Sequence, residues 1–120
     1  MLKVFCFGNE WVEGDSLAKE LADELEIDGV KFIKCDDVED VEDGVILDVV
    51  RGLDDVQVVT ELDRFKSLQP CSAHDLDLAF FLKLLKEMGH LNEVKIICLP
   101  MGMEKERAKK ELRRLLPDNI

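Results

Sequence analysis

Residues 44–50 form the stretch GVILDVV, which is apolar throughout except for Asp48 and the opening glycine. A continuous apolar run of this length is typical of a strand that is covered on both faces, as in a parallel sheet flanked by helices. An ionised carboxylate in such a strand is costly unless it is paired, hydrogen-bonded or bound to a metal. The stretch therefore predicts a central strand with one polar residue that packing alone does not explain.

Other runs along the chain supply the remaining elements of an α/β fold. The expected strands cover residues 2–7, 30–35, 56–62 and 94–99, and the expected helices cover residues 15–25, 74–88 and 103–116. Only Arg51 to Asp55 separate the strand at 44–50 from the one at 56–62, too few for a parallel crossover, so we expect an antiparallel hairpin. The order predicts a three-layer α/β sandwich in a single domain over residues 1–120. Its sheet would be five-stranded and mostly parallel with one antiparallel edge strand, and about three helices would cover it.

The helices differ in how much of their surface is apolar. In the first, Leu17, Leu21 and Leu25 recur at helical spacing, and we expect Lys and Glu side chains to fill the exposed face. The helix at 74–88 is apolar around most of its circumference, which favours a buried position. The last helix is expected to bury Ala108, Leu112, Leu115 and Leu116.

Composition narrows the class of protein. The 120 residues carry 16 basic and 27 acidic side chains, a formal charge of −11, which disfavours binding to nucleic acid or an anionic membrane. No apolar run reaches the roughly 18 residues of a membrane span, and the N-terminus does not resemble a signal peptide. The acidic segment CDDVEDVEDG at 35–44 favours a solvated loop, with a surface for a basic partner or a cation as the alternative.

The four cysteines are spaced unlike a zinc ribbon or a redox pair. Cys6, Cys35 and Cys98 belong to apolar strand-like runs and are expected to be small buried hydrophobes, whereas Cys71 follows Pro70 in a loop. This usage favours a reduced, cytoplasmic protein, and we expect a monomer.

Three polar residues are candidates for one site. Asp15 follows the first strand, Asp48 lies late in the third, and His74 opens the helix at 74–88. Loops at the carboxyl ends of parallel strands share one edge of a sheet, so we expect the three side chains to converge there. Two carboxylates and an imidazole would make a three-ligand site suited to zinc, nickel or a similar ion. Individually, Asp15 is also a candidate helix N-cap, His74 a cap, and Asp48 a structural hydrogen-bond acceptor.

At these residues the chain resembles a known family. The segment GNEWVEGD at 8–15 is similar to the opening signature of the hydrogenase maturation endopeptidases. VILDVV at 45–50 resembles that family's strand with its metal-binding aspartate, and SAHDL at 72–76 resembles the segment that supplies its histidine.

The resemblance implies an endopeptidase, a hydrolase that removes the C-terminal extension of the large-subunit precursor of a [NiFe]-hydrogenase. It also implies that Asp15, Asp48 and His74 are both the metal-binding and the catalytic residues. Nickel would be presented by the substrate and would be held only weakly by the free protein. The hydrogenase large-subunit precursor is thus the expected partner.

Two departures leave an alternative open. Gly14 replaces the first acid of the family's acidic pair, and Asp36-Asp37-Val38 stands where the family typically has a Gly-Gly-Thr turn. The alternative is a non-catalytic relative that binds or chaperones a hydrogenase subunit. A nucleotide or flavin site at the same edge is a weaker alternative, because Glu13 and Asp15 would repel phosphate.

Overall fold

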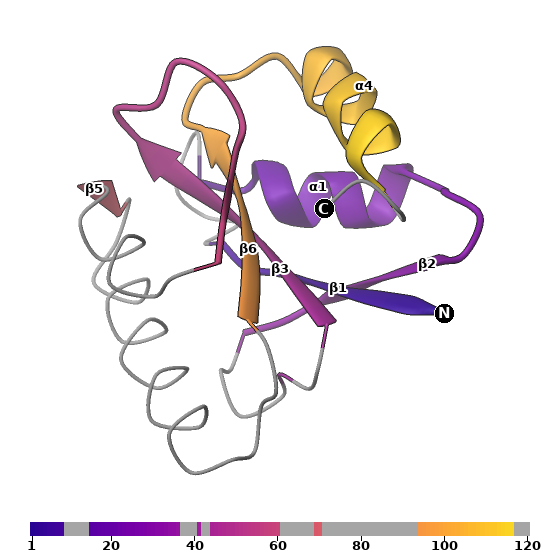
Figure 1. The fold of residues 1–120 in the computed structure, drawn as a ribbon. Helices are drawn as coiled ribbons and strands as arrows, with labels where there is room; N and C mark the ends of the chain where they lie inside the picture. The colour runs from indigo at the N-terminus through magenta and orange to yellow at the C-terminus, as the bar shows by residue number, and fades with distance from the viewer. Residues whose placement is uncertain (9–14, 37–40, 42–43, 61–68, 71–93, 117–120) are drawn as a thin grey trace, which may run out of the picture.

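The computed structural model describes residues 1–8, 15–36, 41, 44–60, 69–70 and 94–116 (Figure 1). The strands are β1 (Leu2–Cys6), β2 (Val30–Lys34), β3 (Gly44–Arg51), β4 (Gln57–Val59), β5 (Gln69–Pro70) and β6 (Val94–Pro100), and the helices are α1 (Leu17–Glu24) and α4 (Lys105–Leu115). The expected helix at 74–88, with His74 at its head, and the loop residue Cys71 lie outside the described residues.

The strands form one mixed sheet with the order β2-β1-β3-β6-β4. β2, β1, β3 and β6 are parallel to one another, and β4 is antiparallel to β6 at the edge. The expected α/β class, with a mostly parallel sheet and one antiparallel edge strand, is confirmed. The short β5 was not expected, and it pairs antiparallel with β3 at Val50 and Arg51.

The hairpin expected between β3 and β4 is wrong, because β6 lies between these two strands. β3 and β6 pair over the whole of residues 44–50 against residues 94–100. That long parallel ladder places the apolar run of β3 in the middle of the sheet, where both of its edges are hydrogen-bonded. β4 then adds to the outer edge of β6, and the link at 52–56 needs to cross only about 10 Å, two strand spacings.

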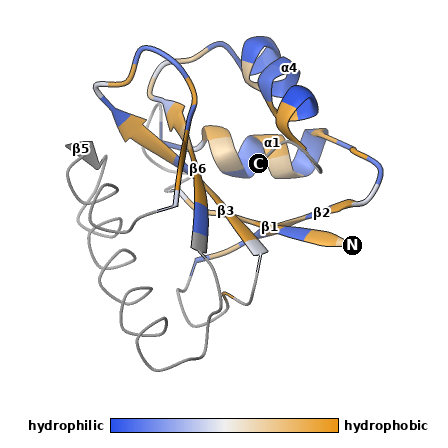
Figure 2. Ribbon diagram, in the orientation of Figure 1, coloured by the Kyte–Doolittle hydropathy of each residue, from blue (hydrophilic) through white to orange (hydrophobic). Residues whose placement is uncertain are grey.

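Side chains alternate between two buried clusters, one on each face of the sheet. In β3, Val45, Leu47 and Val49 belong to the cluster beneath α1 and α4, which also contains Leu21 and Leu112. The helix residues predicted to be buried, Ala108, Leu112, Leu115 and Leu116, are indeed buried. In Figure 2 the strands are predominantly apolar, and α4 has a hydrophilic outer surface.

The opposite face of the sheet is equally buried. Phe5, Phe7, Ile46 and Ile96 are each at most 2% exposed, and they form the second cluster with Val50 and Cys98. Both faces of β3 are therefore covered, as the run GVILDVV predicts.

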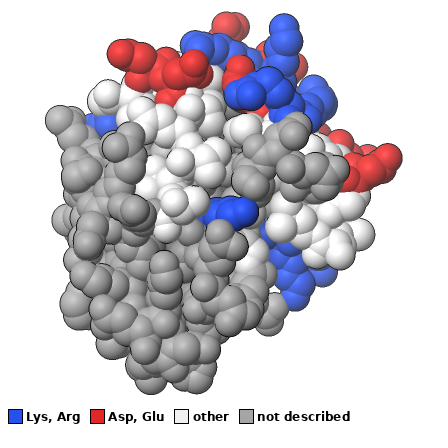
Figure 3. All heavy atoms as spheres, viewed as in Figure 1, with Lys and Arg blue, Asp and Glu red and all other residues white. Residues whose placement is uncertain are grey.

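Ion pairs connect α1 and α4 at the surface of the helical layer that these two helices form. Lys105 Nζ lies 3.1 Å from Glu20 and 2.7 Å from Glu24, and Lys109 Nζ lies 3.3 Å from Glu24. Figure 3 shows basic and acidic side chains intermingled on this part of the molecule. No helix within the described part of the chain is long and apolar enough to cross a bilayer.

Candidate functional site

Asp48 lies in the middle layer of the protein, and its residue is 0% exposed. Its Cα pairs with that of Cys98 on β6. Since Ile46 and Val50 belong to the second cluster, strand alternation directs the Asp48 side chain to that face, opposite α1 and α4. The sequence singles out Asp48 because its neighbours are apolar. Its complete burial means that an ionised carboxylate at this position carries a desolvation cost.

One carboxylate oxygen of Asp48 accepts a hydrogen bond from a backbone amide just beyond the point where the pairing of β1 with β3 ends. The ladder between β1 and β3 ends with the Phe7 N–H donating to the Leu47 carbonyl at 3.0 Å. Two residues further along β3, the Val49 N–H donates to Asp48 Oδ1 at 2.9 Å. Asp48 therefore accepts a buried amide just beyond the end of that ladder. This is the structural hydrogen bond that the sequence left open, and it engages only one carboxylate oxygen.

Asp15 is held at the carboxyl end of β1 by its contact with Gly8. Gly8 has a φ of +147°, and a Cβ built on it would come within 2.1 Å of the Asp15 carbonyl oxygen. The Asp15 residue is 1% exposed. The backbone of Asp15 thus lies directly against Gly8, an approach that only a residue without a side chain allows.

Asp15 is not the N-cap residue of α1. Ser16 occupies the N-cap position but makes no side-chain capping bond, and its hydroxyl donates to Glu20 Oε2 at 2.8 Å instead. Asp15 lies one residue before the N-cap position. The simplest structural explanation for Asp15, an ordinary helix cap, therefore does not describe its place in the fold.

The two aspartates belong to the carboxyl ends of neighbouring strands, since Asp15 follows β1 and Asp48 lies late in β3. Cys6 pairs with Leu47, so the chain that leaves β1 toward Gly8 runs beside Asp48, and Gly8 in turn contacts Asp15. His74 is outside the described residues, so its convergence with the aspartates stays a prediction. Within the described ranges, no group of three His, Cys, Asp or Glu residues is placed to hold a metal ion.

Sequence reasoning missed Lys19, which it placed on the exposed face of the first helix. Lys19 is only 5% exposed, and its ammonium contacts the carboxylate of Asp36, the residue after Cys35 at the end of β2. A second ion pair joins the same two elements one helical turn later, where Lys34 Nζ lies 3.0 Å from Asp23. The opposite charges of residues 19 and 36 are visible in the sequence. Only the tertiary structure shows that α1 and the end of β2 lie close enough for these residues to pair.

The cysteines of the described chain are unsuited to nucleophilic catalysis. Cys6, Cys35 and Cys98 are free and buried, as predicted. Burial, with a smaller contribution from Cys35, raises the pKa of the Cys6 thiol to about 12. Because the thiolate is the nucleophilic form, Cys6 is inert near neutral pH.

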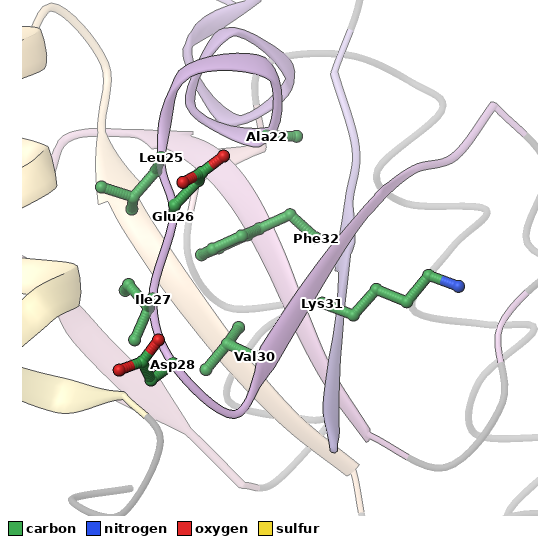
Figure 4. Close-up of a pocket in the computed structure, with 8 residues that line it drawn as sticks. All are labelled: Ala22, Leu25, Glu26, Ile27, Asp28, Val30, Lys31 and Phe32. Atoms are coloured by element: carbon green, nitrogen blue, oxygen red, sulfur yellow. The ribbon is translucent and has the colours of Figure 1, made fainter.

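A cavity of about 410 Å³ lies at the other end of the sheet from the two aspartates. It is formed where α1 ends and β2 begins, between Leu25, Ile27, Val30 and Phe32 (Figure 4). The Lys31 side chain extends away from these residues in the figure. This position separates the cavity from the edge that holds Asp15 and Asp48.

Comparison with solved structures identifies the architecture. The chain is similar to the hydrogenase maturating endopeptidase HybD from Escherichia coli, with a TM-score of 0.67, 14% identity and coverage of 97% of this chain and 90% of that one. It has the fold of the hydrogenase maturation endopeptidases. An endopeptidase from Escherichia coli gives a TM-score of 0.68 at 11% identity, covering 97% of this chain and 90% of that one.

A third similar structure is the [NiFe] hydrogenase maturation protease HybD from Thermococcus kodakarensis. Its TM-score is 0.62 at 18% identity, with coverage of 98% of this chain and 100% of that one. No protein-family model matches the sequence, and no curated protein matches it either. At these identities the likeness shows a shared fold over almost the whole chain, and the expectation of this fold from the sequence is confirmed.

Proposed function

We propose that this protein is an endopeptidase that removes the C-terminal extension of a nickel-loaded [NiFe]-hydrogenase large-subunit precursor. The main support is the pair of buried carboxylates, Asp15 and Asp48, at one edge of this fold. Proteins with the same fold are described as hydrogenase maturation endopeptidases or proteases. The combination of this architecture with two buried acids at its carboxyl edge favours a peptidase over a nucleotide-binding domain.

In this proposal Asp15, Asp48 and His74 recognise the nickel ion that the substrate already carries. Two carboxylates and an imidazole suit a divalent ion that keeps other ligands on its own protein. An ion held in this way can polarise the scissile carbonyl or activate a water molecule. The free protein would bind nickel weakly, because much of the coordination shell belongs to the substrate.

The test compares a nickel-loaded with a nickel-free large-subunit precursor and follows the loss of the C-terminal extension by mass spectrometry. We expect cleavage of the loaded precursor only, and its loss in Asp15→Asn, Asp48→Asn and His74→Ala. The matched control is Asp28→Asn, an exposed aspartate in the loop before β2 at the far end of the sheet. Equal cleavage of both precursors would overturn nickel recognition.

A second candidate is a non-catalytic relative that binds the hydrogenase subunit. The feature that favours it is Asp36, which begins the segment replacing the family's Gly-Gly-Thr turn and contacts the Lys19 ammonium. Binding of the loaded precursor without cleavage, across several candidate hydrogenases, would establish this function in place of the peptidase.

A further inference from the structure

Three charged side chains are buried within the described part of the chain, and all three lie toward the same end of the sheet. They are Asp15, Asp48 and Lys19, so Lys19 is the one buried cation among those residues. Asp15 follows β1, Asp48 lies late in β3, and the Asp36 partner of Lys19 follows β2. A buried ammonium is costly without an anion beside it, so its presence at this end calls for an explanation.

The ion pair between Lys19 and Asp36 is asymmetric. The Lys19 side chain is 6% exposed, whereas that of Asp36 is 92% exposed. The ammonium is therefore set into the protein, and the carboxylate reaches it from the solvent side. If the exposed Asp36 side chain rotates away from Lys19, the buried ammonium requires another anion.

Attachment of α1 to β2 does not by itself account for a buried lysine. The neighbouring pair of Asp23 and Lys34 joins the same two elements with both side chains largely exposed, 60% and 45% respectively. That arrangement is the ordinary solution for a surface ion pair and involves little desolvation. Lys19 differs from Lys34 in being buried, and it lies only four residues after Asp15 in the chain.

We propose that Lys19 forms a carboxylate-binding subsite beside the candidate site, and that Asp36 is the internal carboxylate that a ligand displaces. The ligand is a peptide with an acidic side chain or a free C-terminal carboxylate. This proposal rests on the proposed function only in taking a peptide as the molecule that the site accepts. Lys19 is then a specificity-determining residue, and no bond is made or broken at it.

A subsite in which a ligand carboxylate replaces that of Asp36 suits the charge of this protein. The chain carries a formal charge of −11 and holds two buried acids at this end, so an acidic peptide group would otherwise be repelled. Lys19 supplies the opposing charge locally. Since Asp36 covers the ammonium until the ligand arrives, the buried charge is paired in both states, and the competition keeps the affinity for the ligand modest.

The experiment follows the Lys19 side-chain ammonium by NMR while short peptides are added to the full chain. The probes are Ac-Ala-Ala-Glu-Ala-NH2, its Gln counterpart, and Ac-Ala-Ala-Ala-Ala with a free C-terminus. We expect the Glu peptide or the free-carboxylate peptide to shift the Lys19 signal and the Gln peptide to leave it unchanged. The carboxylate peptide that binds identifies the source of the group, a side chain or a chain end.

Variants distinguish recognition from simple structural support. Asp36→Asn removes the internal competitor from an exposed position, and we expect roughly tenfold tighter binding of the carboxylate peptide. Lys19→Gln is expected to weaken binding roughly 10- to 100-fold, the range for losing a hydrogen bond to a charged group. The control Lys34→Gln breaks the exposed neighbouring pair and should leave binding unchanged.

The decisive variant exchanges the two charges, Lys19→Asp together with Asp36→Lys. The exchange restores a structural ion pair, so the free energy of unfolding should recover relative to Lys19→Gln. It does not restore the buried cation that would bind the ligand. We expect the exchanged protein to fold and to lose carboxylate binding. Wild-type binding by the exchanged protein, or no response of Lys19 to any carboxylate peptide in Asp36→Asn, would overturn the subsite. Neither readout requires nickel or cleavage, so failure of the proposed function is separately visible.

Discussion

Gly8 and Asp15 are in direct contact, although six residues separate them along the chain: a Cβ on Gly8 would lie 2.1 Å from the Asp15 carbonyl oxygen. The contact holds Asp15 at the carboxyl end of β1. Because Cys6 pairs with Leu47 on β3, the end of β1 lies beside the strand that carries Asp48. One glycine thus determines where the first candidate acid stands relative to the second.

Gly8→Ala should therefore destabilise the protein strongly, by about 2 kcal/mol or more, because it combines a backbone clash with a positive φ. The control is Gly102→Ala, at a φ of +85° where a Cβ meets nothing within 4 Å. We expect that variant to lose only about 1 kcal/mol, the cost of backbone strain. Urea unfolding measures both changes in the free energy of unfolding. Equal losses would show that the contact with Asp15 contributes nothing beyond strain.

Asp48→Asn should preserve the fold, with a free energy of unfolding within about 1 kcal/mol of the wild type. The amide oxygen of Asn can still accept from the Val49 N–H, the bond that spans 2.9 Å in the native protein. Asp48→Ala removes the acceptor, leaves that buried amide unsatisfied and should cost about 1–3 kcal/mol. Chemical denaturation compares the two. An unfolded Asp48→Asn protein would favour a structural role for the charge itself.

Acid should weaken the ion-pair contact between α1 and α4. Hydrogen bonds from Ser16 and Lys105 lower the pKa of Glu20 below its ordinary value of 4.5, and those from Lys105 and Lys109 lower the pKa of Glu24. Their stabilising contribution is complete above about pH 4.5 and is lost as the pH falls through the lowered values.

Glu20→Gln with Glu24→Gln should accordingly lower the thermal midpoint at about pH 7, with a smaller difference from the wild type at about pH 3. The control is Glu111→Gln, which alters a pair with Arg114 inside α4 alone. An equal difference at both pH values would contradict the prediction.

At high pH the same contact depends on a lysine. Hydrogen bonds that Lys105 donates to Glu24 and Glu20 raise the pKa of Lys105 above its ordinary value of 10.5. The contribution of Lys105 is therefore complete below about pH 10.5 and is lost as the pH rises through the raised value. Lys105→Gln should lower the thermal midpoint at about pH 8 and should differ less from the wild type at about pH 12.

Cys6 should resist alkylation in the folded protein. Its pKa of about 12 leaves almost no thiolate at about pH 8, and the residue is 0% exposed. Iodoacetamide treatment followed by peptide mapping should find Cys6, Cys35 and Cys98 unmodified until urea is added. Rapid labelling of Cys6 in the native state would show that the sheet opens locally at β1.

The described helices and strands show which sequence patterns were sufficient to predict their positions. β3 and β6 are found where their apolar runs predict, because a run of that length can be accommodated only where both faces are covered. The buried residues of α4 follow equally well, since a helical repeat of apolar side chains can face only one surface. The strand that β4 pairs with did not follow, because a connection of five residues is compatible with pairing to β3 and with crossing one intervening strand.

The sequence by itself determined the α/β class, the buried thiols and the choice of Asp48 as an anomalous residue, since these depend on local composition and periodicity. Tertiary structure decided three things that no local pattern encodes. β6 lies between β3 and β4, Asp15 lies against Gly8, and Lys19 is buried beneath Asp36. Each of these is a contact between segments distant along the chain, so no local pattern of residues can predict it.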